Sequence, residues 1–243
     1  MALYVKFWGT RGSIPTPGHG TQRYGGNTSC VEIRARDQIL ICDGGTGLRE
    51  LGVDLLRRTG NEPLTAHLFF SHPHWDHIQG FPFFTPAYIS THTVCVYGGA
   101  LGDRNIYELL SGQMESAYFP VKFSDLRGNI VTKDFDHGTT ISGVKIRCTR
   151  QFHPGGSLGF SFEYRGAKVV YSTDNELDQV LLNREATLKN PSSLRRVPQE
   201  LIDFAKDADL LIADGQYTEA EYPNKIVHFR AVYRLRTCIR FPR

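Results

Sequence analysis

The segment Ser71-His72-Pro73-His74-Trp75-Asp76-His77 contains three of the chain's nine histidines and one aspartate. The apolar run 66–70 before it is typical of a short buried strand, so the histidines fall on a loop at a sheet edge. In an extended segment, His72 and His74 project to the same side because they are two positions apart. Asp76 and His77 follow where a helix can begin, which turns them back toward the same point. Imidazole and carboxylate ligands suit zinc, manganese or iron, so the segment predicts a metal site.

The number of ligands in this segment bears on the number of metals. Four ligands in six positions exceed what one open catalytic zinc usually takes from protein, and two metals that share the cluster explain the excess. Packing offers no rationale for three imidazoles and a carboxylate on one loop. Isolated histidines are interpreted differently, as ordinary core or surface residues; these are His19, His67, His92 and His137.

Length and composition indicate an ordinary soluble globular protein. The chain has 243 residues, of which 40% are apolar and 22% charged, and this length is ample for one domain with a large core. No apolar run is long enough to span a bilayer, and the first ten residues lack the layout of a signal peptide. We therefore expect a cytoplasmic protein without a membrane partner.

The five cysteines are an odd number, widely scattered, and form no C-x-x-C pair. This argues against a disulfide framework and against a structural zinc ribbon. Because most of them lie in apolar, strand-like runs, we expect buried small hydrophobic residues.

Hydrophobic periodicity and turn residues predict alternating strands and helices in both halves of the chain, with residues 174–198 as a loop or surface insert. These elements predict a mixed α/β (α+β) fold, in which two mixed sheets pack face to face with helices outside, a four-layer αββα sandwich. Strands are expected at residues 3–9, 29–34, 38–42, 66–70, 93–97, 129–135, 140–148, 158–164, 167–173 and 209–213, the last of them of the buried type. Helices are expected at 48–58, with Gly60 as the stop signal, at 105–110 and at 198–206.

The segment His72-Pro73-His74-Trp75-Asp76-His77 matches the H-x-H-x-D-H signature, and the chain resembles the metallo-β-lactamase superfamily of hydrolases. Three further residues fit that pattern in order and spacing over roughly residues 3–222. The resemblance implies that Asp43, at a strand end before a Gly-rich turn, supports the site by orienting ligands. It implies that His153 is the third histidine of the first metal and that Asp174 bridges both metals.

A narrower resemblance comes from the N-terminal loops. Gly9-Thr10-Arg11-Gly12-Ser13 and Arg23-Tyr24-Gly25-Gly26-Asn27-Thr28-Ser29 are similar to a bacterial branch related to cyclic-nucleotide and phosphoribosyl cyclic phosphodiesterases and to Z-type tRNA 3′-processing nucleases. Arg11 and Ser13 suit phosphate oxygens, and a plain loop is the alternative. The Gly-rich turn 43–47 is likewise either ordinary turn chemistry or a phosphate cradle. Asp214, Gln216 and Tyr217 match a late stretch of the branch whose role is undefined.

The resemblance implies a dinuclear metal-dependent hydrolase, with His72, His74, Asp76, His77, His153 and Asp174 as ligands of two divalent ions (zinc, manganese or iron). In such a phosphodiesterase a metal-bridged hydroxide attacks phosphorus, and Asp76 can also take a proton from the nucleophile. The implied substrate is a small phosphodiester or nucleotide-like molecule. A nucleic acid has no separate support in the sequence, and a homodimer is compatible with it.

The resemblance ends near Tyr222-Pro223. The branch continues with a turn histidine, a helix and a strand ending in a histidine pair, which completes the second metal site. Here residues 225–243 carry six basic side chains and no acidic one, so the first 224 residues have a net charge of −3. We expect a hydrolase domain over 1–224 and a basic tail over 225–243, with an atypical or truncated C-terminus from a frame change or a fragment. His228 lies close to the expected turn histidine, and a tail that binds nucleic acid is the functional alternative.

Three functions therefore compete. The first is a dinuclear phosphodiesterase, and the second is a thioester, lactone or β-lactam hydrolase on the same fold, because a fold and its metals do not fix the substrate. The third is a catalytically impaired metal-binding remnant whose second site is incomplete.

Overall fold

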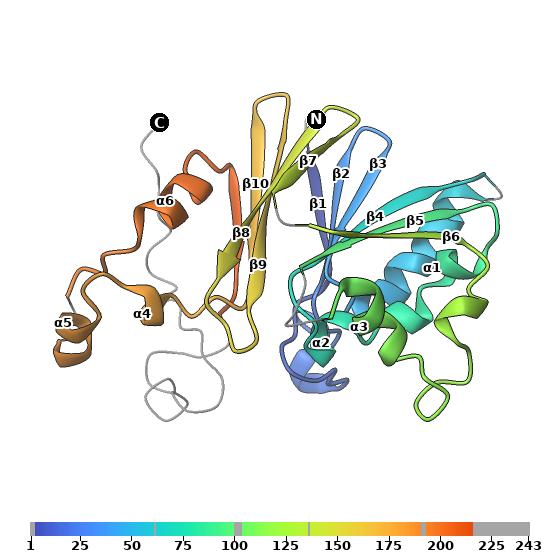
Figure 1. Cartoon of the computed structure of the whole chain (residues 1–243), viewed down its shortest axis with the longest axis horizontal. Coiled ribbons are helices and arrows are strands. Elements are labelled where there is room, and N and C mark those ends of the chain that lie inside the picture. The colour runs from blue at the N-terminus through green and yellow to red at the C-terminus, as the bar shows by residue number, and fades with distance from the viewer. Residues whose placement is uncertain (1–2, 61, 100–103, 136, 191–192, 216–243) are drawn as a thin grey trace. The chain divides into compact units, whose positions relative to one another are not determined.

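The structure is a computed structural model that describes residues 3–60, 62–99, 104–135, 137–190 and 193–215 (Figure 1). The chain divides into two compact units, residues 1–137 with 141–143 and residues 138–140 with 144–243. Each unit contains one sheet. Several expectations fall outside the described residues. These are the tail 225–243, which includes His228 and Cys238, and the residues Gln216 and Tyr217.

The first unit is built on a six-stranded mixed sheet with the order β1-β2-β3-β4-β5-β6. The first three strands form an antiparallel meander, and β3 to β6 run parallel to one another. The strands are β1 Tyr4–Gly9, β2 Cys30–Ala35, β3 Gln38–Cys42, β4 Thr65–Phe70, β5 Thr93–Gly98 and β6 Asn129–Asp134.

Helix α1 (Gly47–Thr59) connects β3 to β4, as a parallel pair of strands requires. Its apolar side chains Leu48, Leu51 and Leu55 recur at helical spacing and are fully buried against one face of the sheet. Gly60, at φ 60°, ends the helix as the sequence predicts. Val53 is part of the same apolar pattern but is 36% exposed, because it points away from the core.

The remaining elements of the first unit are short. Helix α2 (Trp75–Ile78) follows β4, and helix α3 (Ile106–Gly112) follows β5. A capping box starts α3, in which Asn105 and Glu108 exchange side-chain-to-backbone hydrogen bonds. Single 3-10 turns occupy His19–Thr21, Phe81–Phe83, Thr85–Tyr88 and Phe123–Asp125.

The second unit contains a five-stranded sheet with the order β11-β10-β9-β8-β7. Strands β8, β9 and β10 are antiparallel neighbours, while β11 pairs with β10 in parallel. The elements are β7 Gly138–Ile141, β8 Val144–Gln151, β9 Ser157–Tyr164, β10 Ala167–Ser172, α4 Leu177–Val180, α5 Arg184–Lys189, α6 Gln199–Ala205 and β11 Leu210–Ala213.

Three sequence expectations for the second unit are wrong. The single strand at 140–148 is two strands, because Ser142 (φ 47°) and Gly143 (φ 83°) both adopt the left-handed conformation of a tight hairpin turn. The insert at 174–198 contains helices α4 and α5. The last strand, expected to be buried, leaves Leu210 and Leu211 38% and 39% exposed.

The expected fold class is confirmed as a mixed α/β protein with two sheets and helices. Cys30 and Cys42 are fully buried, and burial raises the pKa of both thiols well above its usual value. The four described cysteines form no disulfide with one another. Cys30 and Cys42 are buried as expected, whereas Cys95 and Cys148 are half-buried. Among the described residues, no helix has the length and apolar character needed to cross a membrane.

Two neighbouring positions on α1 test this packing. Leu51→Ala removes a fully buried side chain and should lower the free energy of unfolding by about 2–5 kcal/mol, whereas Val53→Ala should change it by no more than about 0.5 kcal/mol. Urea denaturation followed by tryptophan fluorescence measures both. Equal losses for the two variants would contradict the assignment of the buried face.

Candidate metal centre

The histidine segment of the first unit lies beyond the end of β4, next to the end of β3. These strands are parallel neighbours, so Asp43 after β3 and Ser71 after β4 emerge at the same edge of the sheet. Asp43 has a φ of 59°, which aspartate tolerates better than most residues, and its backbone N–H donates to Phe69 at 2.9 Å. The chain thereby turns so that the Asp43 carboxylate points toward the segment that follows β4.

The buried carboxylate of Asp43 organises this segment. It is 1% exposed and accepts hydrogen bonds from the Ser71 backbone N–H (2.7 Å), the Ser71 hydroxyl (2.9 Å) and His77 Nδ1 (2.7 Å). Ser71 Oγ lies 3.0 Å from His72 Nδ1, and it can accept that proton because its own proton goes to Asp43. Both imidazoles thus use Nδ1 toward Asp43 or Ser71, and each keeps Nε2 as the nitrogen suited to a cation.

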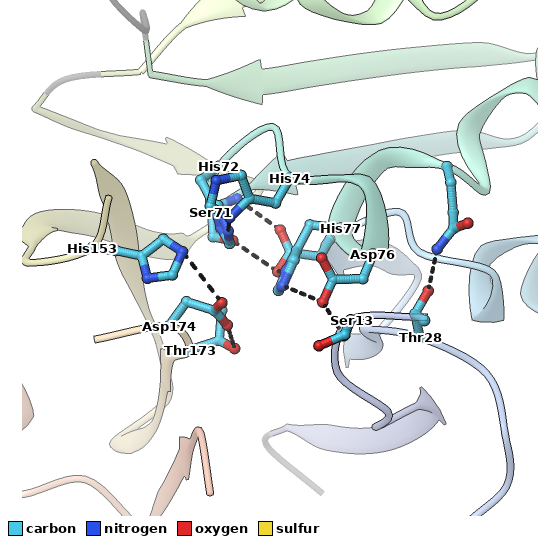
Figure 2. Close-up of polar contacts among 12 residues, drawn as sticks. Ser13, Thr28, Ser71, His72, His74, Asp76, His77, His153, Thr173 and Asp174 are labelled. Atoms are coloured by element: carbon cyan, nitrogen blue, oxygen red, sulfur yellow. Dashed lines mark hydrogen bonds and ion pairs between the residues drawn. The ribbon is translucent and has the colours of Figure 1, made fainter. Parts of the chain in front are cut away.

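The four expected ligands of the first unit form two close pairs (Figure 2). His72 Nε2 lies 2.9 Å from His74 Nδ1. His77 Nε2 lies 3.5 Å from Asp76 Oδ2, and the side chains of these two residues are 1% and 14% exposed. Each pair brings two donor atoms to one point, which is the arrangement that a divalent cation requires.

The Gly-rich turn 43–47 packs directly beneath this segment. The Gly44 N–H donates to the His77 carbonyl at 2.7 Å, and a Cβ on Gly45 would lie 2.3 Å from the Asp76 carbonyl oxygen. The Gly45 N–H donates to the Ser29 carbonyl at 2.8 Å. Because its N–H groups bond to protein oxygens, the turn serves close backbone approach and does not form a phosphate cradle.

The loop of residues 10–28 also contacts the segment. The Ser13 backbone N–H donates to Asp76 Oδ2 at 2.7 Å, with Ser13 in the left-handed region at φ 69°. Arg11 is exposed, and its own N–H is fixed to the Asn27 carbonyl at 2.9 Å. The expected phosphate-binding role of Ser13 rested on its hydroxyl, whereas the structure shows its backbone N–H bonded to Asp76.

Sequence reasoning missed a pair of threonines that fix this loop. Thr28 Oγ1 accepts from the Thr46 N–H at 2.8 Å, and Thr46 Oγ1 accepts from the Thr28 N–H at 2.9 Å. This reciprocal pair joins the 10–28 loop to the Gly-rich turn. The signal available in the sequence was a threonine in each of two Gly-rich motifs.

The second unit contributes His153 and Asp174 at one edge of its sheet. Strands β8 and β10 both run antiparallel to β9, so the residues that follow them emerge at the same edge. His153 Nε2 lies 3.6 Å from Asp174 Oδ2 (Figure 2). Their loops are joined because Phe152 receives a hydrogen bond from the Glu176 N–H at 2.7 Å and donates its own N–H to Asn175 at 3.2 Å.

The Asp174 carboxylate is held in place locally. Asp174 is in the left-handed conformation at φ 47°, and its Oδ1 accepts from Thr173 Oγ1 at 2.9 Å. His153 and Asp174 therefore present an imidazole nitrogen and a carboxylate oxygen together, as the two pairs of the first unit do. In donor type, the pair in this unit suits a divalent metal, as each pair of the first unit does.

A sequence model of the beta-lactamase superfamily domain matches residues 39–239. The chain belongs to this family. The matched range contains all six expected ligands and Asp43, and the chain is accordingly a metallo-β-lactamase-fold hydrolase.

Individual relatives agree with this assignment. Ribonuclease Z of Haloarcula marismortui is 29% identical over 252 residues, covering 90% of this chain and 76% of the relative. The crystal structure of the short form of human tRNase Z is similar in fold, with a TM-score of 0.60 and 18% identity over 94% of this chain and 84% of that one. Zn(2+)-bound PqqB from Methylobacterium extorquens has a TM-score of 0.55 and 12% identity over 91% and 75% of the two chains.

The Asp43 network can be tested without disturbing the backbone. Asn suits the same left-handed conformation, but Asp43→Asn replaces one acceptor oxygen with an NH₂ group that opposes a donor. We expect zinc affinity to fall by about 10- to 100-fold, measured by competition with a chromophoric chelator. Asp37→Asn, in the exposed turn between β2 and β3, is the matched control and should leave affinity unchanged. Unchanged affinity in Asp43→Asn would contradict an orienting role.

Proposed function

We propose that the chain is a dinuclear metal-dependent phosphodiesterase. The observation that carries this proposal is the division of the segment 72–77 into two donor pairs, His72 with His74 and Asp76 with His77, both adjoining the Asp43 network. The similarity to a ribonuclease Z over 90% of the chain supports phosphodiesters as the substrate class.

The resemblance to the superfamily allocates the ligands to two ions. His72, His74 and His153 would hold the first ion, Asp76 and His77 the second, and Asp174 would contribute to both. Zinc and manganese suit these donors, and the Zn(2+)-bound PqqB of similar fold favours zinc. When bound, such ions lower the pKa of a coordinated water and neutralise charge on phosphoryl oxygens.

The protein's own side chains supply positioning and proton transfer. The Ser13 N–H fixes Asp76 Oδ2, so the other carboxylate oxygen of Asp76 is directed by that bond and can take a proton from the attacking water. Arg11 is exposed two residues before Ser13, and we propose that its guanidinium binds a phosphate oxygen of the substrate. Asp43 is buried and acts only by orienting His72 and His77.

Two ligand variants test the assignment. His74→Ala and Asp76→Ala should each lower metal-stimulated hydrolysis of bis(4-nitrophenyl) phosphate by at least about 100-fold, because each removes one donor of a pair. His137→Ala, an exposed histidine elsewhere in the chain, is the control. Full activity in either ligand variant would refute the proposed site.

The substrate class requires a separate comparison. With added Mn²⁺ or Zn²⁺, the wild-type protein should hydrolyse a phosphodiester and leave a simple lactone or thioester intact. Selective hydrolysis of the lactone or thioester would assign the chain to the second candidate class on the same fold.

A further inference from the structure

Trp75 is the residue of the segment 72–77 that neither the metal donors nor the core accounts for. It is the first residue of α2, between His74 and Asp76, and it is 63% exposed. The next two side chains of the helix, Asp76 and His77, are only 14% and 1% exposed. The helix therefore turns its donors inward and leaves the largest side chain of the segment in solvent.

The backbone that carries Trp75 is held firmly. The Gln79 N–H donates to the Trp75 carbonyl at 2.9 Å, and the His77 N–H donates to the His74 carbonyl at the same distance. The Gly-rich turn packs against the neighbouring Asp76 carbonyl. Because this backbone is already ordered, a flat ligand that covers the ring has no backbone to order there.

Two other aromatic side chains of the first unit, Trp8 and Tyr24, have partners that Trp75 lacks. Trp8 donates its indole N–H to Glu32 at 3.0 Å and lies under the Lys6 ammonium group. The exposed Tyr24 ring is covered by Arg23. Within the described parts of the chain, Trp75 has no side-chain hydrogen bond, ring contact or cation–π contact. The fold gains little from an indole at this position.

We propose that Trp75 stacks on a base of the substrate, so that the phosphodiester is a nucleoside ester or a nucleic acid. This inference rests on the proposed phosphodiesterase function. Trp75 lies between the expected ligands His74 and Asp76, so its Cα is about 3.8 Å from the Cα of each. In a nucleotide, a single sugar joins the base to the phosphate, so a base stays close to a phosphate bound at these residues. Every base has a π-face, so this contact recognises bases with little preference among them.

Two substrates with one leaving group isolate the base. Thymidine 5′-(4-nitrophenyl phosphate) and ethyl 4-nitrophenyl phosphate both release nitrophenolate, and only the first carries a base. Trp75→Ala should lower kcat/KM for the thymidine ester by about 5- to 150-fold, mainly through KM, and change that for the ethyl ester by less than about 2-fold. Trp75→Phe should restore most of the loss.

A matched control separates stacking from loss of any exposed aromatic ring. Tyr118 is 72% exposed, and Tyr118→Ala should behave as wild type on both esters. Equal losses on the two esters in Trp75→Ala would overturn the inference and give Trp75 a structural role. Wild-type protein without preference for the thymidine ester would overturn it as well, and would leave a protein or lipid contact as the role of the indole.

A binding readout keeps this inference distinguishable from the proposed function. Adenosine 5′-monophosphate should quench tryptophan emission in the wild type and in Tyr118→Ala, and the quenching should be absent in Trp75→Phe. Ethyl phosphate should cause none. Quenching without hydrolysis of either ester would refute the phosphodiesterase and support base stacking, whereas hydrolysis without quenching would refute base stacking alone.

Discussion

The Asp43 carboxylate is the group on which the metal-binding segment depends. A buried carboxylate is stable only when hydrogen-bond donors surround it, and here Ser71 and His77 supply three. The same bonds engage Nδ1 of His77 and, through Ser71, Nδ1 of His72, so Nε2 of each imidazole is the nitrogen suited to a metal in the proposed site. One residue after β3 thus couples the end of the sheet to the chemistry of the loop after β4.

The glycines near Asp43 allow the segment 72–77 to lie close to the end of β3. The segment 72–77 can approach the end of β3 only where side chains are missing, and Gly80 shows how close this approach is. A Cβ on Gly80 would lie 1.9 Å from the Gly45 carbonyl oxygen, and its N–H donates to the Gly44 carbonyl at 2.8 Å. The close packing of these backbones therefore also fixes the positions of the expected ligands in the first unit.

The sequence predicts what depends on local patterns. The strand–helix order of the first unit, the stop of α1 at Gly60 and the histidine segment follow from periodicity, turn residues and ligand chemistry. The hairpin turn at Ser142-Gly143 was missed because apolar residues flank it on both sides and hide the break. Helices α4 and α5 were missed because four- and six-residue helices carry too few apolar positions for a period to show.

Tertiary contacts explain the remaining differences in the site. Ser13 meets Asp76 through a backbone N–H, and Thr28 meets Thr46 across two motifs, so residue type alone does not reveal either contact. The roles of His153 and Asp174 came from the family resemblance, because a single histidine or aspartate after a strand has no pattern of its own. The proposed centre for two metals is tested most directly by metal stoichiometry. After saturation with Zn²⁺ or Mn²⁺ and removal of free metal, elemental analysis of the whole chain should give two equivalents per chain, and one equivalent or none would contradict it.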